Sequence, residues 1–395
     1  MSVFTDQRHR MLAIATAITC ITVVGIGLSL SVPLLSFVLE ARGVSGTMIG
    51  INTAMSGVAT IMLAPFIPNI AARMGTRRLL ISALVLGAAV FISFYYAGPF
   101  WLWFPLRFLF GVSLCVLFVL SEFWINAAAP EGSRGLVMGI YASCLSVGFA
   151  IGPTVLTIFP PTSMTPYVIG AVLFLLSIIP VALAGQLMPS IDHTPSNQVL
   201  LYLAAAPSAV LAAFIFGAVE TGGMSFLPLY GLRNGYSEAS AALLVSILAL
   251  GNVLVQIPMG LISDRVDRRK LLLTLGAVGF VGAAAMPFAA QHAFALFPIV
   301  AIWGGLVAGL YTVGLAHLGA QFRGSQLAGA NATFVMMYSL GLLAGPPAMG
   351  LGMDIWNPHG LPLTIALLFL LYVVVVAWRI ATGRSASQKV TVENP

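Results

Sequence analysis

Long apolar stretches alternate with short polar connections along the whole chain. A helix that crosses a membrane needs about 20 mostly apolar residues. Twelve stretches meet that length, and they fall at 11–39, 46–70, 79–98, 100–125, 135–158, 165–187, 204–231, 239–262, 271–290, 294–318, 326–350 and 361–382. The pattern therefore predicts an all-α integral membrane protein with twelve transmembrane helices.

The composition favours contact with lipid over contact with water. Of the 395 residues, 59% are hydrophobic and only 7% are charged, whereas an ordinary soluble protein carries about 25% charged residues. A surface so poor in charge needs lipid to cover it. The formal net charge of +6 is better explained by basic residues in short loops than by a nucleic-acid partner.

Basic residues gather on alternate connections. With the N-terminus placed in the cytoplasm, the inner segments hold 14 Lys and Arg residues, and the outer loops hold only Arg42 and Arg233. Cytoplasmic loops of membrane proteins are enriched in Lys and Arg. The distribution predicts that both termini are cytoplasmic.

The longest polar connection lies near the midpoint and divides the chain into two halves. Residues 68–80 match residues 260–272 at an offset of 192 positions, and 133–153 match 326–346 at an offset of 193. Two parallel six-helix repeats are typical of transporters. The expected organisation is an N-terminal half (1–187), a cytoplasmic linker (188–203), a C-terminal half (204–383) and a cytoplasmic tail (384–395).

Three short motifs resemble a known family. The segment "GLISDRVDRRKLL" at 260–272 resembles the inner-loop signature of the major facilitator superfamily. "GFAIGP" at 148–153 and "RFLFG" at 107–111 resemble motifs of its proton-coupled drug antiporter branch. The amino-acid sequences of segments 121–135 and 227–246 are similar to those of a proteobacterial subfamily of facilitators. The resemblance covers essentially the whole chain, and it implies the two-half fold, secondary transport and a multi-pass location in a bacterial inner membrane.

The loop signature supplies a candidate inner gate. Its first copy is eroded, since Pro68 replaces Gly and Ala72 replaces Asp, and in the second copy Asp267 stands in place of the usual Gly. The candidate gate residues are Arg73, Arg77, Gly260, Asp264, Arg265, Arg268 and Arg269. A carboxylate here can bind basic residues of the other half when the cytoplasmic side closes, each pair contributing about 1 kcal/mol. The alternative is that these charges only orient the protein in the membrane.

Four ionisable residues fall inside the predicted helices, namely Arg107, Glu122, Glu220 and His317. Such residues are costly in a bilayer and are therefore functional candidates. Glu220 lies near the middle of its helix and is the first candidate for proton coupling. Glu122 and His317 are further proton-coupling candidates, which we expect in the cytoplasmic third of the membrane, facing each other. A purely structural role is the alternative for each of them.

The helix that carries Glu220 has an unusual composition. Gly222 and Gly223 follow the carboxylate closely, and Pro228 lies eight residues beyond it. Transporters use discontinuous helices at their binding sites. The sequence predicts a weakened or broken helix at this point.

Other polar residues are candidates for lining a substrate cavity, and they are Arg107, Asn52, Tyr141, Asn252, Gln256, Asn331 and Tyr338. Asn252 and Gln256 are four residues apart and share one helix face. Arg107 can neutralise an anionic substrate, repel the coupled proton, or reach the outer headgroups. Hydrogen bonding between helices is the alternative for the amides.

Small residues recur four apart on two helices that the repeat makes equivalent. Gly148 and Gly152 form one such pair, and Gly341 and Gly345 form the other. These pairs let helices approach closely. In the family that the chain resembles, the helices that carry them meet across the halves, so we expect contacts across the halves here.

The motifs exclude several classes of function. The sequence has no phosphate-binding loop, metal-ligand spacing or nucleophile–base motif, so we expect no enzyme, cofactor or metal. The expected function is alternating-access transport by a monomer in the lipid bilayer, with a small molecule and protons as partners, and proton-coupled export is favoured. The alternative is proton-coupled uptake of a small metabolite. Arg107 would favour an anionic metabolite. A membrane sensor built on a transporter fold is the alternative outside transport.

Overall fold

The computed structural model describes residues 7–128, 134–184, 206–322 and 324–382, in which every element is helical. The N-terminal set of helices comprises α1 (Gln7–Ala41), α2 (Gly46–Leu63), η1 (Ala64–Phe66), α3 (Ile67–Met74), α4 (Thr76–Tyr96), η2 (Phe100–Leu102), α5 (Trp103–Ala128), α6 (Arg134–Ile151), η4 (Gly152–Thr154), α7 (Val155–Ile158), α8 (Thr165–Leu176) and α9 (Ile178–Leu183). The C-terminal set comprises α11 (Pro207–Arg233), α12 (Glu238–Ser263), α13 (Arg268–Ala289), α14 (Ala293–Gln321), α15 (Gly324–Ile355) and α16 (Gly360–Ala381).

Most of these helices have the length and apolarity of membrane spans. Within the described ranges, 11 helical segments are long and apolar enough to cross a membrane, and Ser143–Ile158 forms a shorter apolar helix. The predicted multi-pass, all-helical architecture is confirmed. The count of twelve spans and the cytoplasmic termini stay predictions. The predicted linker, 188–203, and tail, 384–395, lie outside the described residues.

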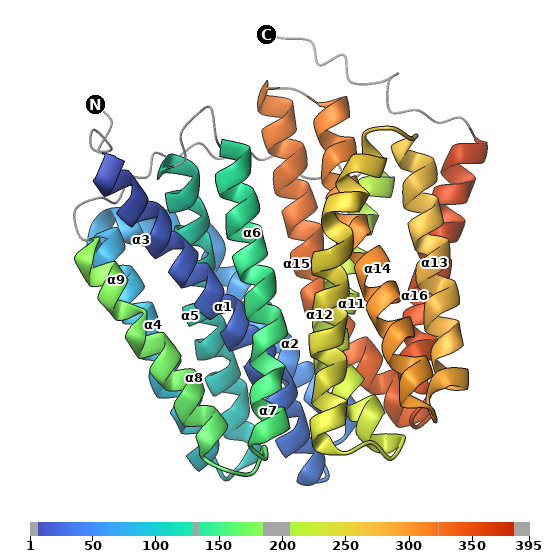
Figure 1. Ribbon diagram of the computed structural model, residues 1–395, viewed down its shortest axis with the longest axis horizontal. Helices are drawn as coiled ribbons and strands as arrows, with labels where there is room; N and C mark the ends of the chain where they lie inside the picture. Colours follow the sequence, from blue (N-terminus) through green and yellow to red (C-terminus); the bar gives the residue numbers. More distant parts are fainter. Residues whose placement is uncertain (1–6, 129–133, 185–205, 323, 383–395) are drawn as a thin grey trace.

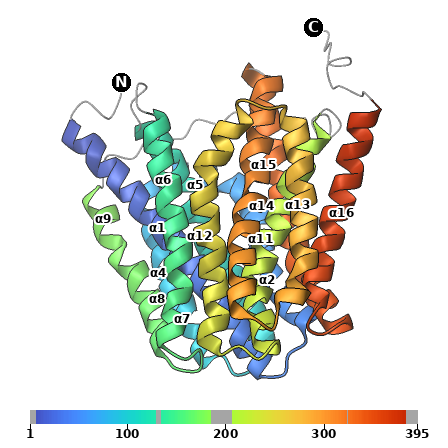
Figure 2. The same cartoon turned by 45° about the vertical axis from the view of Figure 1, so that its right-hand side comes forward.

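The helices run side by side as one bundle with two sets (Figure 1). Helices α1 to α9 form one side and α11 to α16 the other. The start of α1 and the end of α16 lie at the same end, which we call the terminal face, and the opposite end is the far face. Figure 2 brings α11, α12 and α14 of the C-terminal set into view beside one another.

Two similar turns lie at the far face, separated by the offset of the sequence repeat. Gly43 has φ 73° and precedes Ser45, whose hydroxyl accepts from the Met48 amide and caps α2. Gly235, 192 positions later, has φ 89° and precedes Ser237, which caps α12. A positive φ favours glycine, and serine is a preferred N-cap residue. The two turns therefore have the same local chemistry as well as the same place in the repeat.

Close helix packing occurs within each half at the paired glycines. A Cβ at Gly148 would lie 2.7 Å from the carbonyl oxygen of Thr22 on α1, and one at Gly341 would lie 2.8 Å from the Ala218 amide on α11. The glycine pairs themselves therefore pack within their own halves, while the helices that carry them contact the other half at other residues. One such contact is the hydrogen bond that the Ser246 hydroxyl of α12 donates to the Ala150 carbonyl of α6 at 2.9 Å.

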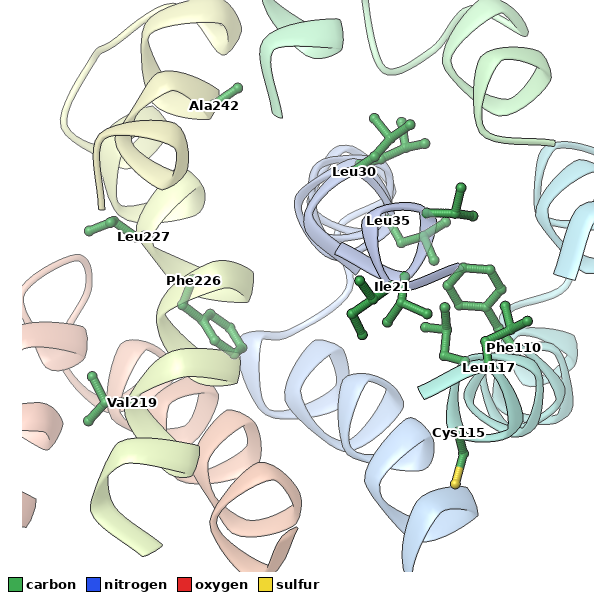
Figure 3. Close-up of a cluster of buried hydrophobic side chains, with 14 of the residues drawn as sticks. Ile21, Leu30, Leu35, Phe110, Cys115, Leu117, Val219, Phe226, Leu227 and Ala242 are labelled. Carbon is green, nitrogen blue, oxygen red and sulfur yellow. The ribbon is translucent and has the colours of Figure 1, made fainter. Parts of the chain in front are cut away.

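Contact across the halves also joins α2 to α15, the eleventh predicted helix. A Cβ at Gly46 would lie 2.8 Å from the carbonyl oxygen of Gly350, and one at Gly50 would lie 2.8 Å from Cα of Pro347. Small residues allow such backbone approach in membranes. Buried side chains fill the rest of each half, and Figure 3 shows Ile21 and Leu35 of α1 converging with Phe110 of α5.

The predicted break in the helix around Glu220 is absent, since α11 is continuous from Pro207 to Arg233. At Gly222 an added Cβ would collide with the Met349 side chain of α15, so this glycine makes room for a neighbour. Lipid offers no competing hydrogen bonds to the backbone. The helix therefore tolerates its glycines and Pro228 without unwinding.

Asp267 is the N-cap residue of α13, whereas Gly75 is the N-cap residue of the equivalent helix α4 in the first repeat. Its carboxylate accepts from the Lys270 and Arg269 amides at 3.1 and 2.8 Å. These backbone hydrogen bonds, with Lys270 first, lower the pKa of Asp267. A lowered pKa in the folded state means that the cap is fully formed above the unfolded pKa of about 3.9 and is lost only as pH falls through the folded value.

Replacing Asp267 by alanine should lower stability by about 1 kcal/mol, because a helix loses its N-cap. Asp267→Asn keeps an acceptor and should cost much less. Thermal unfolding of the purified protein at pH 5 and pH 7 measures both effects. The same difference between the variants is expected at both pH values, and equal stabilities of Asp267→Ala and Asp267→Asn would contradict the capping role.

Candidate functional site

A pocket lies at the middle of the bundle, where α6 of the N-terminal set meets α11, α12 and α14. Its lining is largely apolar and aromatic, and comprises Ser146, Phe149, Phe216, Val219, Glu220, Met224, Val245, Leu248, Ala249, Asn252, Trp303, Gly304 and Val307. Ligand sites are commonly apolar concavities with a few well-placed polar groups. This pocket has that character and is walled by both halves.

Glu220 is the carboxylate of the pocket. The Tyr338 hydroxyl of α15 donates to Oε2 of Glu220 at 2.5 Å. The Tyr338 ring stacks on Phe216 at 6.0 Å between centroids and meets Tyr311 edge-on at 5.6 Å. Phe216 lies one turn before Glu220 on the same helix face. An aromatic cluster therefore fixes the wall beside the carboxylate.

Asn252 lines the same pocket as Glu220, but Gln256, one turn along α12, does not. Oδ1 of Asn252 is buried and has no hydrogen-bond partner within the described residues. A buried polar atom without a partner costs free energy. The amide therefore offers an unused hydrogen-bonding group to an occupant of the pocket.

An apolar cluster lies on the far-face side of the pocket. Met224 of α11 and Val245 of α12 are nearer the far face than Glu220 and Asn252, and both are buried. They pack with Val32 of α1, and Phe149 packs against this cluster. Side chains from both halves therefore cover the pocket toward the far face.

Arg107 is separate from the pocket. Its side chain is 1% exposed, and Nη2 donates to Oγ1 of Thr53 on α2 at 3.3 Å. The Thr53 hydroxyl lies 3.3 Å from Oγ of Ser225 on α11, which in turn is 2.9 Å from Oγ of Ser36 on α1. Arg107 therefore belongs to a polar chain that crosses between the halves.

Two further polar contacts join the halves at the far face, and we call them the far-face latch. Arg233 of α11 donates from Nε and Nη2 to the two carboxylate oxygens of Glu40 of α1, at 2.7 and 2.9 Å. Asp354 of α15 accepts from the Gly46 and Thr47 amides at the start of α2, each at 2.7 Å. A carboxylate is stabilised at a helix N-terminus. The halves are thus fastened together at this end.

The remaining candidate residues lie elsewhere. Glu122 is exposed on α5, and His317 is buried on α14 with Nε2 2.9 Å from the Gln321 amide nitrogen. The Tyr141 hydroxyl shares a 3.0 Å hydrogen bond with Ser121 inside the N-terminal set. Asn52 on α2 and Asn331 on α15 have buried Oδ1 atoms without a partner in the described parts of the chain. The meeting of Glu122 with His317 stays a prediction.

The residues of the candidate inner gate lie at the terminal face. Arg268 donates from Nη2 to Asp264 at 3.1 Å and from Nε to Ser263 at 3.3 Å, so its contacts stay inside one loop. Arg73, Arg77, Asp264 and Arg265 are exposed, Arg269 is half-buried, and a side chain at Gly260 would meet open space. In this conformation the described contacts of Asp264 remain within its own half.

Sequence reasoning missed the aromatic wall and the far-face latch. Phe216 carries a signal, since it lies four residues before Glu220 on one face. For Trp303 and Phe149, no nearby polar residue in the sequence distinguishes them from ordinary packing residues. The latch residue Arg233 was counted only for topology, and its partner Glu40 is 193 positions away. No cluster of His, Cys, Asp and Glu fit for a metal occurs within the described ranges.

Comparisons with known proteins agree with this architecture. The family profile of the Major Facilitator Superfamily matches residues 17–236 and 209–394. The chain is 24% identical over 345 residues to the uncharacterized MFS-type transporter YfkF of Bacillus subtilis strain 168, which covers 84% of this chain and 86% of YfkF. It is 27% identical over 281 residues to YcaD of Escherichia coli K12 (DH10B), covering 70% and 72% of the two chains.

Solved structures show the same fold at low sequence identity. The crystal structure of the nucleoside transporter NupG has a TM-score of 0.71 at 16% identity, covering 95% of this chain and 98% of NupG. An inward-facing, occupied bacterial homolog of the human lysosomal transporter Spinster has a TM-score of 0.76 at 14% identity, covering 96% and 98%. The chain belongs to the Major Facilitator Superfamily and is a multi-pass membrane protein of the secondary transporters that move small molecules.

Proposed function

We propose that the protein is a proton-coupled transporter that carries a small molecule through the central pocket, with Glu220 as the coupling residue. The observation that carries the proposal is the position of Glu220, a carboxylate at mid-bundle in a pocket shared by both halves. Its described partner, the Tyr338 hydroxyl, is neutral. A buried carboxylate is costly in a membrane unless a proton or a cation neutralises it. If the proton on Glu220 is exchanged for a cation, or released and rebound, occupancy of the pocket is coupled to proton movement.

The described lining of the pocket has no basic residue to pair with an anionic substrate. The anionic alternative depended on Arg107, whose side chain contacts Thr53 outside the pocket lining. We therefore propose antiport, in which an outgoing substrate and an incoming proton use the same pocket. The proposed setting is a bacterial inner membrane, with a monomer whose termini are cytoplasmic and whose far face is periplasmic.

In alternating access, one end of the bundle would be closed while the other is open, and the two ends would then change roles. The far-face latch and the apolar cluster around Met224 close one end. Opening that end must break the Glu40–Arg233 pair and free Asp354 from α2. Asp264 would then contact basic residues of the N-terminal half at the terminal face, where Arg73 and Arg77 are exposed. Several weak pairs together can bias such a two-state equilibrium.

The test begins with a thermal-shift screen of the purified protein against drugs and metabolites. A ligand at 100 times its dissociation constant stabilises by about 2.7 kcal/mol. Hits are then followed in proteoliposomes with an imposed pH gradient. We expect Glu220→Gln to exchange substrate across the membrane but to lose all response to the gradient. The matched control is Glu122→Gln on α5, which should keep the response. Gradient-driven transport in Glu220→Gln, with its loss in Glu122→Gln, would transfer the role to Glu122.

A further inference from the structure

We propose that the pocket selects a protonated amine with an apolar body, and rejects anions and neutral analogues of the same shape. This inference rests on the proposed function only in taking the pocket as the substrate site. It adds the chemical class of the substrate, which follows from the charge and shape of the lining.

The charge of the lining has one sign. Glu220 is acidic, and none of the described lining residues is Lys, Arg or His. Arg107, the basic residue in the membrane-spanning part of α5, donates to Thr53 and is not among the lining residues of the pocket. An anion would therefore enter beside a carboxylate without a counter-charge. A cation would supply the opposite charge that a buried carboxylate needs.

The polar groups of the pocket suit an ammonium group. Glu220 receives one hydrogen bond at Oε2, from Tyr338, and a carboxylate accepts several. The Asn252 side chain offers Oδ1, which is buried and has no partner among the described residues. An ammonium group has only donors. It would satisfy both acceptors, whereas a carboxylate on the ligand would satisfy neither.

The rest of the lining suits an aromatic or aliphatic body. Phe149, Phe216 and Trp303 come from three different helices, and Met224 adds a flexible apolar side chain. The indole N–H of Trp303 donates to the Gly279 carbonyl at 3.0 Å, so that side chain has no spare polar group for a ligand. Cations are attracted to aromatic faces. The Phe216 ring is held by Tyr338 and Tyr311, at centroid distances of 6.0 and 5.6 Å.

The experiment uses three probes with the same body: 4-phenylbutylamine, 4-phenylbutan-1-ol and 4-phenylbutyrate. Each is titrated by calorimetry into the full chain in lipid nanodiscs near neutral pH, with empty nanodiscs as the control for partition into lipid. We expect the amine to bind at least about tenfold more tightly than the alcohol, and the carboxylate not to bind. Glu220→Gln should weaken amine binding by about tenfold, or about 1.4 kcal/mol, and leave the alcohol unchanged.

A second variant keeps the test independent of Glu220. Asn252→Leu preserves side-chain size and removes the acceptor, and we expect amine affinity to fall several-fold. Its matched control is Gln256→Leu, one turn along α12 and outside the lining, which should bind the amine like the wild type. Equal loss in both variants would assign the effect to damage of α12 and overturn the role of Asn252.

The outcomes separate this inference from the proposed function. Equal affinity for the three probes, no binding at all, or amine binding unaffected by Glu220→Gln would overturn the substrate class. Selective amine binding together with no response of amine transport to a pH gradient would overturn proton coupling and leave the cation selectivity intact. Selective binding with gradient-driven transport supports both.

Discussion

Replacing Gly50 by valine is expected to leave the protein folded but unable to close its far face. An added Cβ would collide with the carbonyl oxygen of Pro346 and lie 2.8 Å from Cα of Pro347. These neighbours are backbone atoms of α15 and cannot rotate away. Overpacking of this kind costs about 1–3 kcal/mol or more. Because α2 and α15 belong to different halves, the strain is relieved by separating the halves rather than by unfolding either one.

The measurement is the distance between spin labels at Thr162 and Gln291, two exposed positions in different halves. Thr162 lies in the connection from α7 to α8 and Gln291 in that from α13 to α14, and both connections are at the far face (Figure 1). We expect the wild type to show a short distance and Gly50→Val a longer one, with normal yield and a single peak in gel filtration. The matched control is Gly345→Val, whose Cβ would collide with the Ala218 carbonyl inside the C-terminal half. That variant should lose yield, because it has no rigid-body movement to relieve the clash. An unchanged distance in well-folded Gly50→Val would show that the halves do not separate here.

The contrast between these two glycines shows what the sequence predicted and what it did not. The helix spans and the two-half repeat can be predicted because the length of an apolar stretch and a 192-residue offset between similar segments are properties of the amino-acid sequence alone. The partner of a small-residue pair is not local. Gly345 and Gly50 are both small residues inside apolar helices, but one packs within its half and the other across the halves. Only three-dimensional packing distinguishes them.

The candidate site divides in the same way. Glu220, Asn252 and Tyr338 were found because polar groups inside an apolar helix are rare and costly. Arg107 met the same criterion, but its side chain turned toward Thr53 and Ser225 rather than the pocket. Depth along a helix is readable from residue number, but the direction of a side chain around the helix depends on its neighbours. Phe149 and Trp303 of the aromatic wall were missed because they look like any other lipid-facing or core residues in the sequence.

Reversing one charge of the far-face latch should open the far face, and reversing both should partly close it again. The Glu40 and Arg233 side chains are only 23% and 16% exposed, and they form two hydrogen bonds. Removing one partner leaves the other charge half-buried and unpaired, which we expect to cost about 1–3 kcal/mol of the closed state. Since 1.4 kcal/mol is a tenfold change in an equilibrium, the closed-to-open ratio of Glu40→Arg should fall by about tenfold.

The double reversal Glu40→Arg with Arg233→Glu tests whether the pair itself is responsible. Its recovery should be incomplete, because Nη1 of Arg233 also donates to Asn357 at 3.2 Å, and a glutamate at that position would lose this bond. Glu238→Arg is the matched control, since Glu238 is an exposed acid at the same face, at the start of α12. The Thr162–Gln291 spin-label distance is measured in the wild type, Glu40→Arg, the double reversal and Glu238→Arg. If Glu40→Arg and Glu238→Arg lengthen this distance equally, general surface charge controls the far face. If only Glu40→Arg lengthens it, and the double reversal brings it back toward the wild type, the Glu40–Arg233 pair holds the halves closed. Breaking that pair is then a required step of each transport cycle.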